Sequence, residues 1–113
     1  HGYQLANLQF SLKRLAEAKA TINKTTECED IEKAYVQFPI DKNEKQNVPL
    51  KAAAFNLQGL IAFELKEYQI ASTSFKNALE IMPKFALATQ NANAVLVTIQ
   101  NEKKNKVVQK KKN

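Results

Sequence analysis

The segment AAAFNLQGLIAFELKEYQIASTSFKNALEIMPKF, residues 52–85, decides the fold. We predict one helix from about residue 48 to 66 and a second from about 68 to 82, which Pro83 ends because a proline cannot continue a helix. Gly59 and Ala71 have side chains small enough to let the two helix backbones approach closely. The segment therefore predicts a tightly packed pair of antiparallel helices.

This segment resembles the tetratricopeptide repeat, a unit of about 34 residues with a bulky residue, a small one four positions later, an A-x3-F step and a closing proline. The residues in register with that pattern are Phe55, Gly59, Tyr68, Ala71, Phe75, Ala78 and Pro83. Gln58 and Ala62 depart from it, because leucine and tyrosine are usual there, so we expect different packing at these two positions. The resemblance implies antiparallel helical hairpins stacked as a short right-handed superhelix.

The flanks of this repeat are less regular and are expected to form degenerate repeat units. An apolar stripe at helical spacing predicts one helix over residues 3–23; its members are Leu5, Leu8, Leu12, Leu15, Ala18 and Ile22. Thr26 and Glu29 form a capping-box pattern, which predicts a short helix over 27–38 that ends before Pro39.

Aligning Pro39 with Pro83 places Ile31 on Phe75 and Ala34 on Ala78, with ten extra residues assigned to an exposed loop over 40–49. Asn47 is expected to cap the next helix, with Pro49 in its first turn. A fifth helix is expected over 84–103, and no alternating pattern predicts a strand. The class is all-α with about five helices. We expect residues 3–101 to form one domain, residues 1–2 to be an expression-tag remnant, and residues 102–113 to form a lysine-rich tail.

The residue inventory argues against an enzyme and against any metal or cofactor. The chain has two glycines, so it cannot build a glycine-rich phosphate loop, and its single histidine is His1. Its single cysteine, Cys28, can form neither an internal disulfide nor a thiolate cluster. The carboxylates nearest to it, Glu27, Glu29, Asp30 and Glu32, are expected to cap a helix rather than to bind an ion. We therefore expect no catalytic, cofactor-binding or metal-binding residue.

The resemblance implies that a peptide binds along the surface lined by the first helix of each repeat. On this sequence the groove maps to Asn56, Leu60, Phe63, Leu87, Gln90, Ala94 and Val97. Such a groove would suit an apolar peptide or helix, with Asn56 and Gln90 hydrogen-bonding its backbone. The alternative is that the same residues pack against the N-terminal helix of this short array.

The formal charge of +6 is concentrated in residues 102–113, which carry six lysines and one glutamate and therefore +5. A lysine-rich end attracts nucleic acid by charge alone, but Arg14 is the only arginine and no aromatic residue follows Phe85 to stack on a base. The composition thus favours a solvated tail over nucleic-acid contact.

The sequence predicts a cytoplasmic protein-interaction module with an unidentified protein or peptide partner and no membrane span. Two alternatives remain. One is a small nucleic-acid-binding protein that acts through the tail, and the other is a self-associating domain, such as a homodimer.

Overall fold

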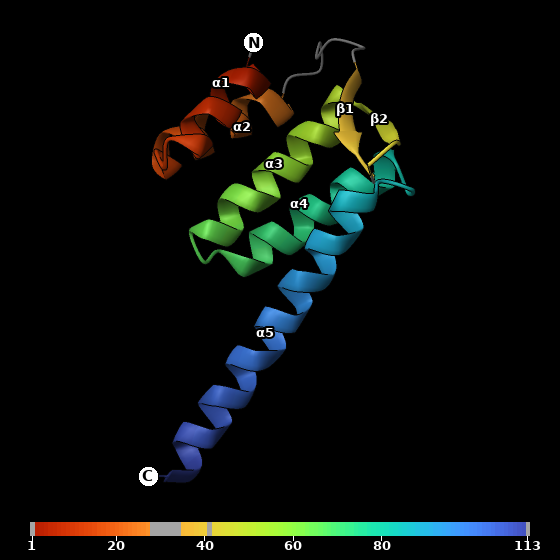
Figure 1. The fold of residues 1–113 in the computed structure, drawn as a ribbon. Helices are drawn as coiled ribbons and strands as arrows, with labels where there is room; N and C mark the ends of the chain where they lie inside the picture. The colour runs from red at the N-terminus through yellow and green to blue at the C-terminus, as the bar shows by residue number, and fades with distance from the viewer. Residues whose placement is uncertain (1, 28–34, 41, 113) are drawn as a thin grey trace.

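The computed structural model describes residues 2–27, 35–40 and 42–112, and it describes the side chains only as far as residue 104. This part of the chain forms five helices and one two-stranded sheet (Figure 1). The elements are α1 (Gly2–Ser11), α2 (Leu15–Glu27), β1 (Tyr35–Pro39), β2 (Lys45–Pro49), α3 (Leu50–Glu64), α4 (Tyr68–Ile81) and α5 (Ala86–Lys112). The protein is therefore mostly helical, as the sequence predicted.

The pair formed by α3 and α4 lies at the centre of the molecule. Ala71, Phe75 and Ala78 of α4 are completely buried. A Cβ atom added to Gly59 of α3 would lie 2.5 Å from Cε1 of Phe75, so only glycine allows this approach of the two helices. Phe55 and Tyr68 are half-buried around the crossing, and Pro83 is exposed between α4 and α5.

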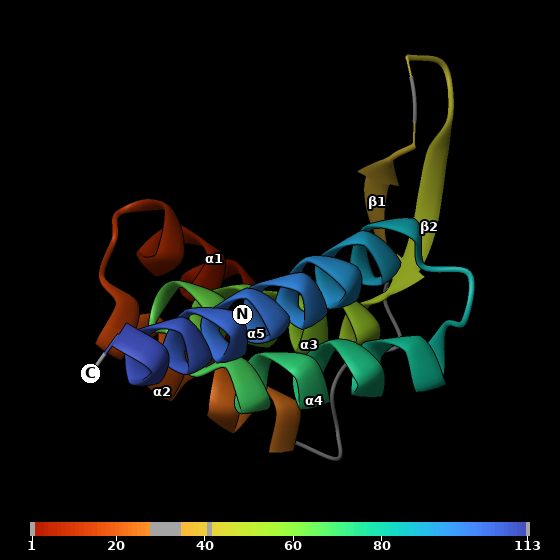
Figure 2. The same ribbon diagram turned by 90° about the horizontal axis from the view of Figure 1, so that it is seen from below.

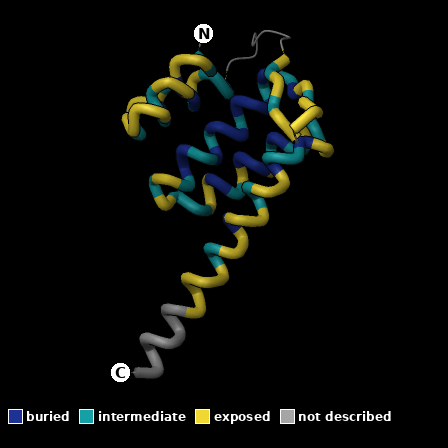
Figure 3. The backbone as a smooth tube through the Cα atoms, in the orientation of Figure 1, coloured by how far each residue is buried: buried dark blue, intermediate teal, exposed yellow. Residues whose placement is uncertain are grey.

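The other helices pack on this central pair in chain order, α2 against α3 and α5 against α4 (Figure 2). Many of the buried residues lie in α3 and α4, whereas much of α1 and of the middle of α5, up to residue 104, is exposed (Figure 3). The fold thus leaves apolar residues uncovered on its two outermost helices.

The first and second helical hairpins share one turn geometry. Lys13 and Lys66 both have a φ of 62°, in the left-handed region. The amide of Lys13 donates to the carbonyl of Phe10, and that of Lys66 donates to Phe63, both at 3.0 Å. Each residue of the first hairpin therefore corresponds to the residue 53 positions later, as Lys13 does to Lys66. The alignment of Pro39 with Pro83 is therefore wrong. Ile31 and Ala34, which that alignment matched to Phe75 and Ala78, lie outside the described residues.

The single helix predicted over 3–23 is wrong, because the chain reverses direction between α1 and α2. The left-handed backbone at Lys13 breaks the helix, and α1 then packs on α2. Ala18 and Ile22 of the predicted stripe are buried together with Ala6, whereas Leu5, Leu8 and Leu12 of the same stripe are exposed. Gly2, which was interpreted as part of a tag remnant, is the first residue of α1; His1 lies outside the described residues.

The helix predicted over 27–38 is wrong at residues 35–38, and the loop predicted over 40–49 is wrong at residues 45–49, whereas the described residues 40 and 42–44 form no helix or strand, as predicted. β1 and β2 pair as an antiparallel hairpin, with Val36 opposite Val48 and Pro39 opposite Lys45. Burial alternates along both strands, and the ring of Phe38 lies 5.2 Å from that of Phe85. Packing on α3 and on the start of α5 therefore outweighs the helical spacing of the apolar residues.

The predicted helix caps near this hairpin are absent as well. Thr26 lies in the last turn of α2, where its hydroxyl donates to the carbonyl of Asn23, and Glu29 lies outside the described residues. Asn47 pairs with Gln37 in the sheet, and Pro49 takes the N-cap position of α3.

Replacing either left-handed lysine with glycine should stabilise the protein, because glycine adopts a positive φ without steric penalty. Lys13→Gly and Lys66→Gly should each raise the free energy of unfolding by about 0.5–1 kcal/mol in urea denaturation. Lys76→Gly, at an exposed position inside α4, is the matched control and should lower it by about 1 kcal/mol. Destabilisation by all three changes would contradict the shared turn geometry.

Filling the helix crossing should destabilise the protein. Gly59→Ala forces the new methyl group against the ring of Phe75 and should lower the free energy of unfolding by about 1–3 kcal/mol. The exposed residue Asn93 of α5 offers a control, since Asn93→Ala adds no clash and should change stability by less than about 0.5 kcal/mol. An unchanged thermal midpoint for Gly59→Ala would show that the helices are not in close contact there.

Candidate functional site

The structure separates the seven predicted groove residues into buried, half-buried and exposed groups. Asn56 is only 3% exposed, and its side-chain oxygen accepts a hydrogen bond from the amide of Asn91 on α5 at 3.0 Å. It therefore joins α3 to α5. The expectation that Asn56 hydrogen-bonds a peptide backbone is wrong, because the neighbouring helix covers it.

Three of the predicted residues are half-buried between helices. Leu60 and Phe63 pack against an apolar cluster to which α5 contributes Val95. Phe63 also meets the ring of Tyr68 edge-on, with ring centroids 5.6 Å apart. Leu87 packs in a second cluster near the start of α5. These side chains contribute to the core and still present part of their surface to solvent.

The remaining three, Gln90, Ala94 and Val97, are exposed on α5. Val97 is 54% exposed, and the adjacent Leu96 is 50% exposed. We use the term α3–α5 face for four predicted groove residues that keep part of their surface in solvent: Leu60 and Phe63 on α3, and Ala94 and Val97 on α5. These four side chains carry no charge, so the face can accept apolar groups without desolvating an ion.

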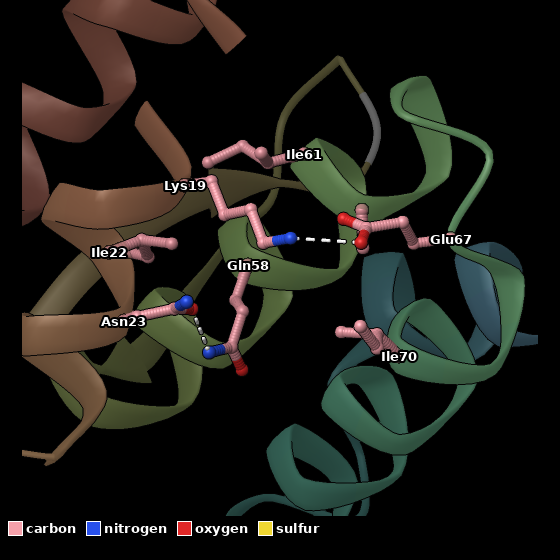
Figure 4. A pocket seen from close by; sticks show the side chains of 8 residues that line it. Lys19, Ile22, Asn23, Gln58, Ile61, Glu67 and Ile70 are labelled. Carbon is pink, nitrogen blue, oxygen red and sulfur yellow. Dashed lines mark hydrogen bonds and ion pairs between the residues drawn. The ribbon is translucent and has the colours of Figure 1, made fainter. Parts of the chain in front are cut away.

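A hollow lies on another side of α3, between α2 and the start of α4 (Figure 4). Its volume of about 50 Å³ is far below the several hundred Å³ of a typical small-molecule site. The lining residues are Lys19, Ile22, Asn23, Gln58, Ile61, Ala62, Glu67 and Ile70. The hollow can hold water but offers no room for a substrate.

Gln58 connects three helices beside this hollow. Its amide donates to the side-chain oxygen of Asn23 on α2 at 2.8 Å, and its carbonyl oxygen accepts from the hydroxyl of Ser74 on α4 at 2.9 Å. Gln58 and Ala62 are the two positions where the sequence departs from the repeat pattern. Around Gln58, hydrogen bonds supplement the apolar packing between helices.

An ion pair crosses the hollow in a position that sequence reasoning missed. Lys19 Nζ lies 2.8 Å from Glu67 Oε2, joining α2 to the start of α4. The second oxygen of Glu67, Oε1, is buried and has no hydrogen-bond partner among the described residues. The two residues are 48 positions apart, so no local spacing could have indicated this pair.

No group of three His, Cys, Asp or Glu side chains within the described residues is placed to hold a metal ion. Burial raises the pKa of the Tyr3 phenol, which packs between two apolar clusters. Cys28, Glu29, Asp30 and Glu32 lie outside the described part of the chain.

None of the described helices is long and apolar enough to cross a membrane. Comparison of the chain with models of known protein families, with curated protein sequences and with solved structures finds no match.

Breaking the bond between α3 and α5 should destabilise the protein. Asn91→Ala leaves the buried oxygen of Asn56 without a donor, which should lower the free energy of unfolding by about 1–3 kcal/mol. Asn93→Ala, an exposed asparagine two residues away, is the control and should have almost no effect. Equal thermal midpoints for the two variants would mean that the hydrogen bond contributes nothing to stability.

Proposed function

We propose that this protein is a non-catalytic interaction module that binds an apolar segment of another protein across the α3–α5 face. The observation that carries the proposal is the exposure of Val97, at 54%, on the same side of α5 as the exposed residues Gln90 and Ala94, which precede it by seven and three positions. Uncovered apolar surface that continues into the core is typical of protein-binding sites. The resemblance of residues 52–85 to tetratricopeptide repeats implies the same class of function.

The chemistry of the face indicates the kind of segment that would bind. Apolar side chains of the partner would pack on Phe63 and Val97, and the amide of Gln90 offers a hydrogen-bonding group at the edge. Asn56 is excluded from contact because Asn91 already binds it. The partner's affinity therefore depends on buried apolar area more than on recognition of a charged terminus.

We propose no catalytic role because of the amino-acid composition. General acid–base chemistry most often uses histidine, and the single histidine of this chain is at position 1. We also propose a cytoplasmic location.

A photo-crosslinking amino acid placed at Val97 tests this function in cells that express the protein. We expect a covalent adduct with a partner protein at this position and none at Thr73, which is exposed on α4. Adding Ala94→Glu should reduce the yield at least about tenfold, because binding would then bury a charge. Ala94 is exposed, so this change leaves the core intact, unlike changes at Leu60 or Phe63.

Two results would contradict the proposal. Equal adduct yields at Val97 and Thr73 would show nonspecific contact. An adduct of two copies of this chain would assign the α3–α5 face to self-association.

A further inference from the structure

A second apolar surface lies on α1, which does not contribute to the α3–α5 face. Leu5, Leu8 and Leu12 are 49%, 56% and 57% exposed, and their spacing of three and four places them on one side of the helix. Residues 2–12 contain no charged side chain. We call this surface the α1 leucine face.

The shared hairpin geometry identifies the corresponding surface of α3, where Leu5, Leu8 and Leu12 become Gln58, Ile61 and Leu65. That surface is covered. Ile61 is 1% exposed and lies in one cluster with Ala18 and Ile22 of α2, and Leu65 packs against the same cluster. The helix α2 is therefore an example, within this protein, of a helix that packs on a face equivalent to the α1 leucine face.

The charges at the end of the two faces are opposite in sign. Glu67, at the end of the covered face, pairs with Lys19 of the covering helix at 2.8 Å. Its counterpart at the end of the α1 leucine face is Arg14, which is largely exposed. Arg14 makes one long contact of 3.8 Å with Glu17, and such exposed pairs contribute little. A helix that covers α1 as α2 covers α3 would accordingly place an acidic residue where α2 has Lys19.

A second copy of this chain fits the α1 leucine face less well. In an antiparallel pairing of two α1 helices, Arg14 of one copy would lie near residues 2–4 of the other, where no acidic side chain is available. A parallel pairing would bring the two Arg14 side chains together. The charge pattern therefore favours a different protein as the occupant.

We propose that the α1 leucine face binds an amphipathic helix of a partner protein. This helix has small and branched apolar residues four positions apart, as Ala18 and Ile22 are in α2, and an acidic residue directly after the first of them. It packs across α1 in the way that α2 packs across α3, with its carboxylate near Arg14.

A peptide copied from α2, residues 15–27, tests the proposal against the full chain by fluorescence anisotropy. A lactam bridge between positions 16 and 20, which are exposed in the protein, holds the peptide helical. The Lys19→Glu peptide should bind about two- to five-fold more tightly than the peptide that keeps Lys19, which corresponds to a surface ion pair. The Ile22→Asp peptide should not bind.

Matched variants of the protein locate the site. Arg14→Glu should reverse the preference, so that the Lys19 peptide becomes the tighter ligand. Leu8→Glu should weaken both peptides at least about tenfold, whereas Leu96→Glu on α5, an equally exposed leucine, should change neither affinity. Circular dichroism establishes that each variant retains its helix content.

Several outcomes would overturn the proposal. Failure of both peptides to bind would exclude this site, and so would equal affinities for the two peptides. Binding that persists in Leu8→Glu would also exclude it, and would indicate that the peptide replaces α2 on the surface of α3. A protein that sediments as a dimer and is dissociated by Leu8→Glu would assign the face to a second copy.

Discussion

The close crossing of α3 and α4 is the constraint on which the remaining structure depends. Gly59 leaves no space between the α3 backbone and the ring of Phe75, and that ring is completely buried. With these two helices held together, α3 offers its other side to α2 and α4 offers its other side to α5. Apolar contact between neighbouring helices then buries three clusters that run through the molecule.

The β-hairpin stabilises one end of this arrangement. Phe38 packs on Phe85, and Val48 is completely buried beside the first turns of α3. The side-chain oxygen of Gln46 accepts from the amide of Ala86 at 3.1 Å and so satisfies a free N–H group at the start of α5. The hairpin thus fixes where α5 begins, and through α5 the position of the exposed residue Val97.

Both surfaces proposed for binding follow from the same property of stacked hairpins. Among the described elements, α2, α3 and α4 each pack against the helix before and the helix after them in the chain, whereas α1 contacts α2 and α3, and α5 contacts α4 and α3. The apolar residues that would contact a further helix remain in solvent, among them Leu8 on α1 and Val97 on α5. Covering such surface stabilises a complex by the same hydrophobic effect that stabilises the fold.

The amino-acid sequence by itself determined the mostly helical class and the α3–α4 pair, because Gly59, Ala71 and Phe75 act through spacing within one continuous segment. It also indicated a helix after Pro83, where α5 (Ala86–Lys112) begins and continues through most of the predicted lysine-rich tail. Tertiary structure decided the hairpins on the N-terminal side of α3 and the accessibility of the predicted groove residues. The apolar residues Tyr35 and Phe38 have a helical spacing, yet their segment forms a strand because Val36 and Phe38 pack on helices far along the chain. The apolar stripe of the first segment correctly indicated that Ala18 and Ile22 are buried, but the left-handed turn at Lys13 brings Ala6 inward instead of Leu5 and Leu8. Asn56 is not available to hydrogen-bond a peptide because Asn91, 35 residues away, already donates to it. Local spacing carries no information on a contact at that separation.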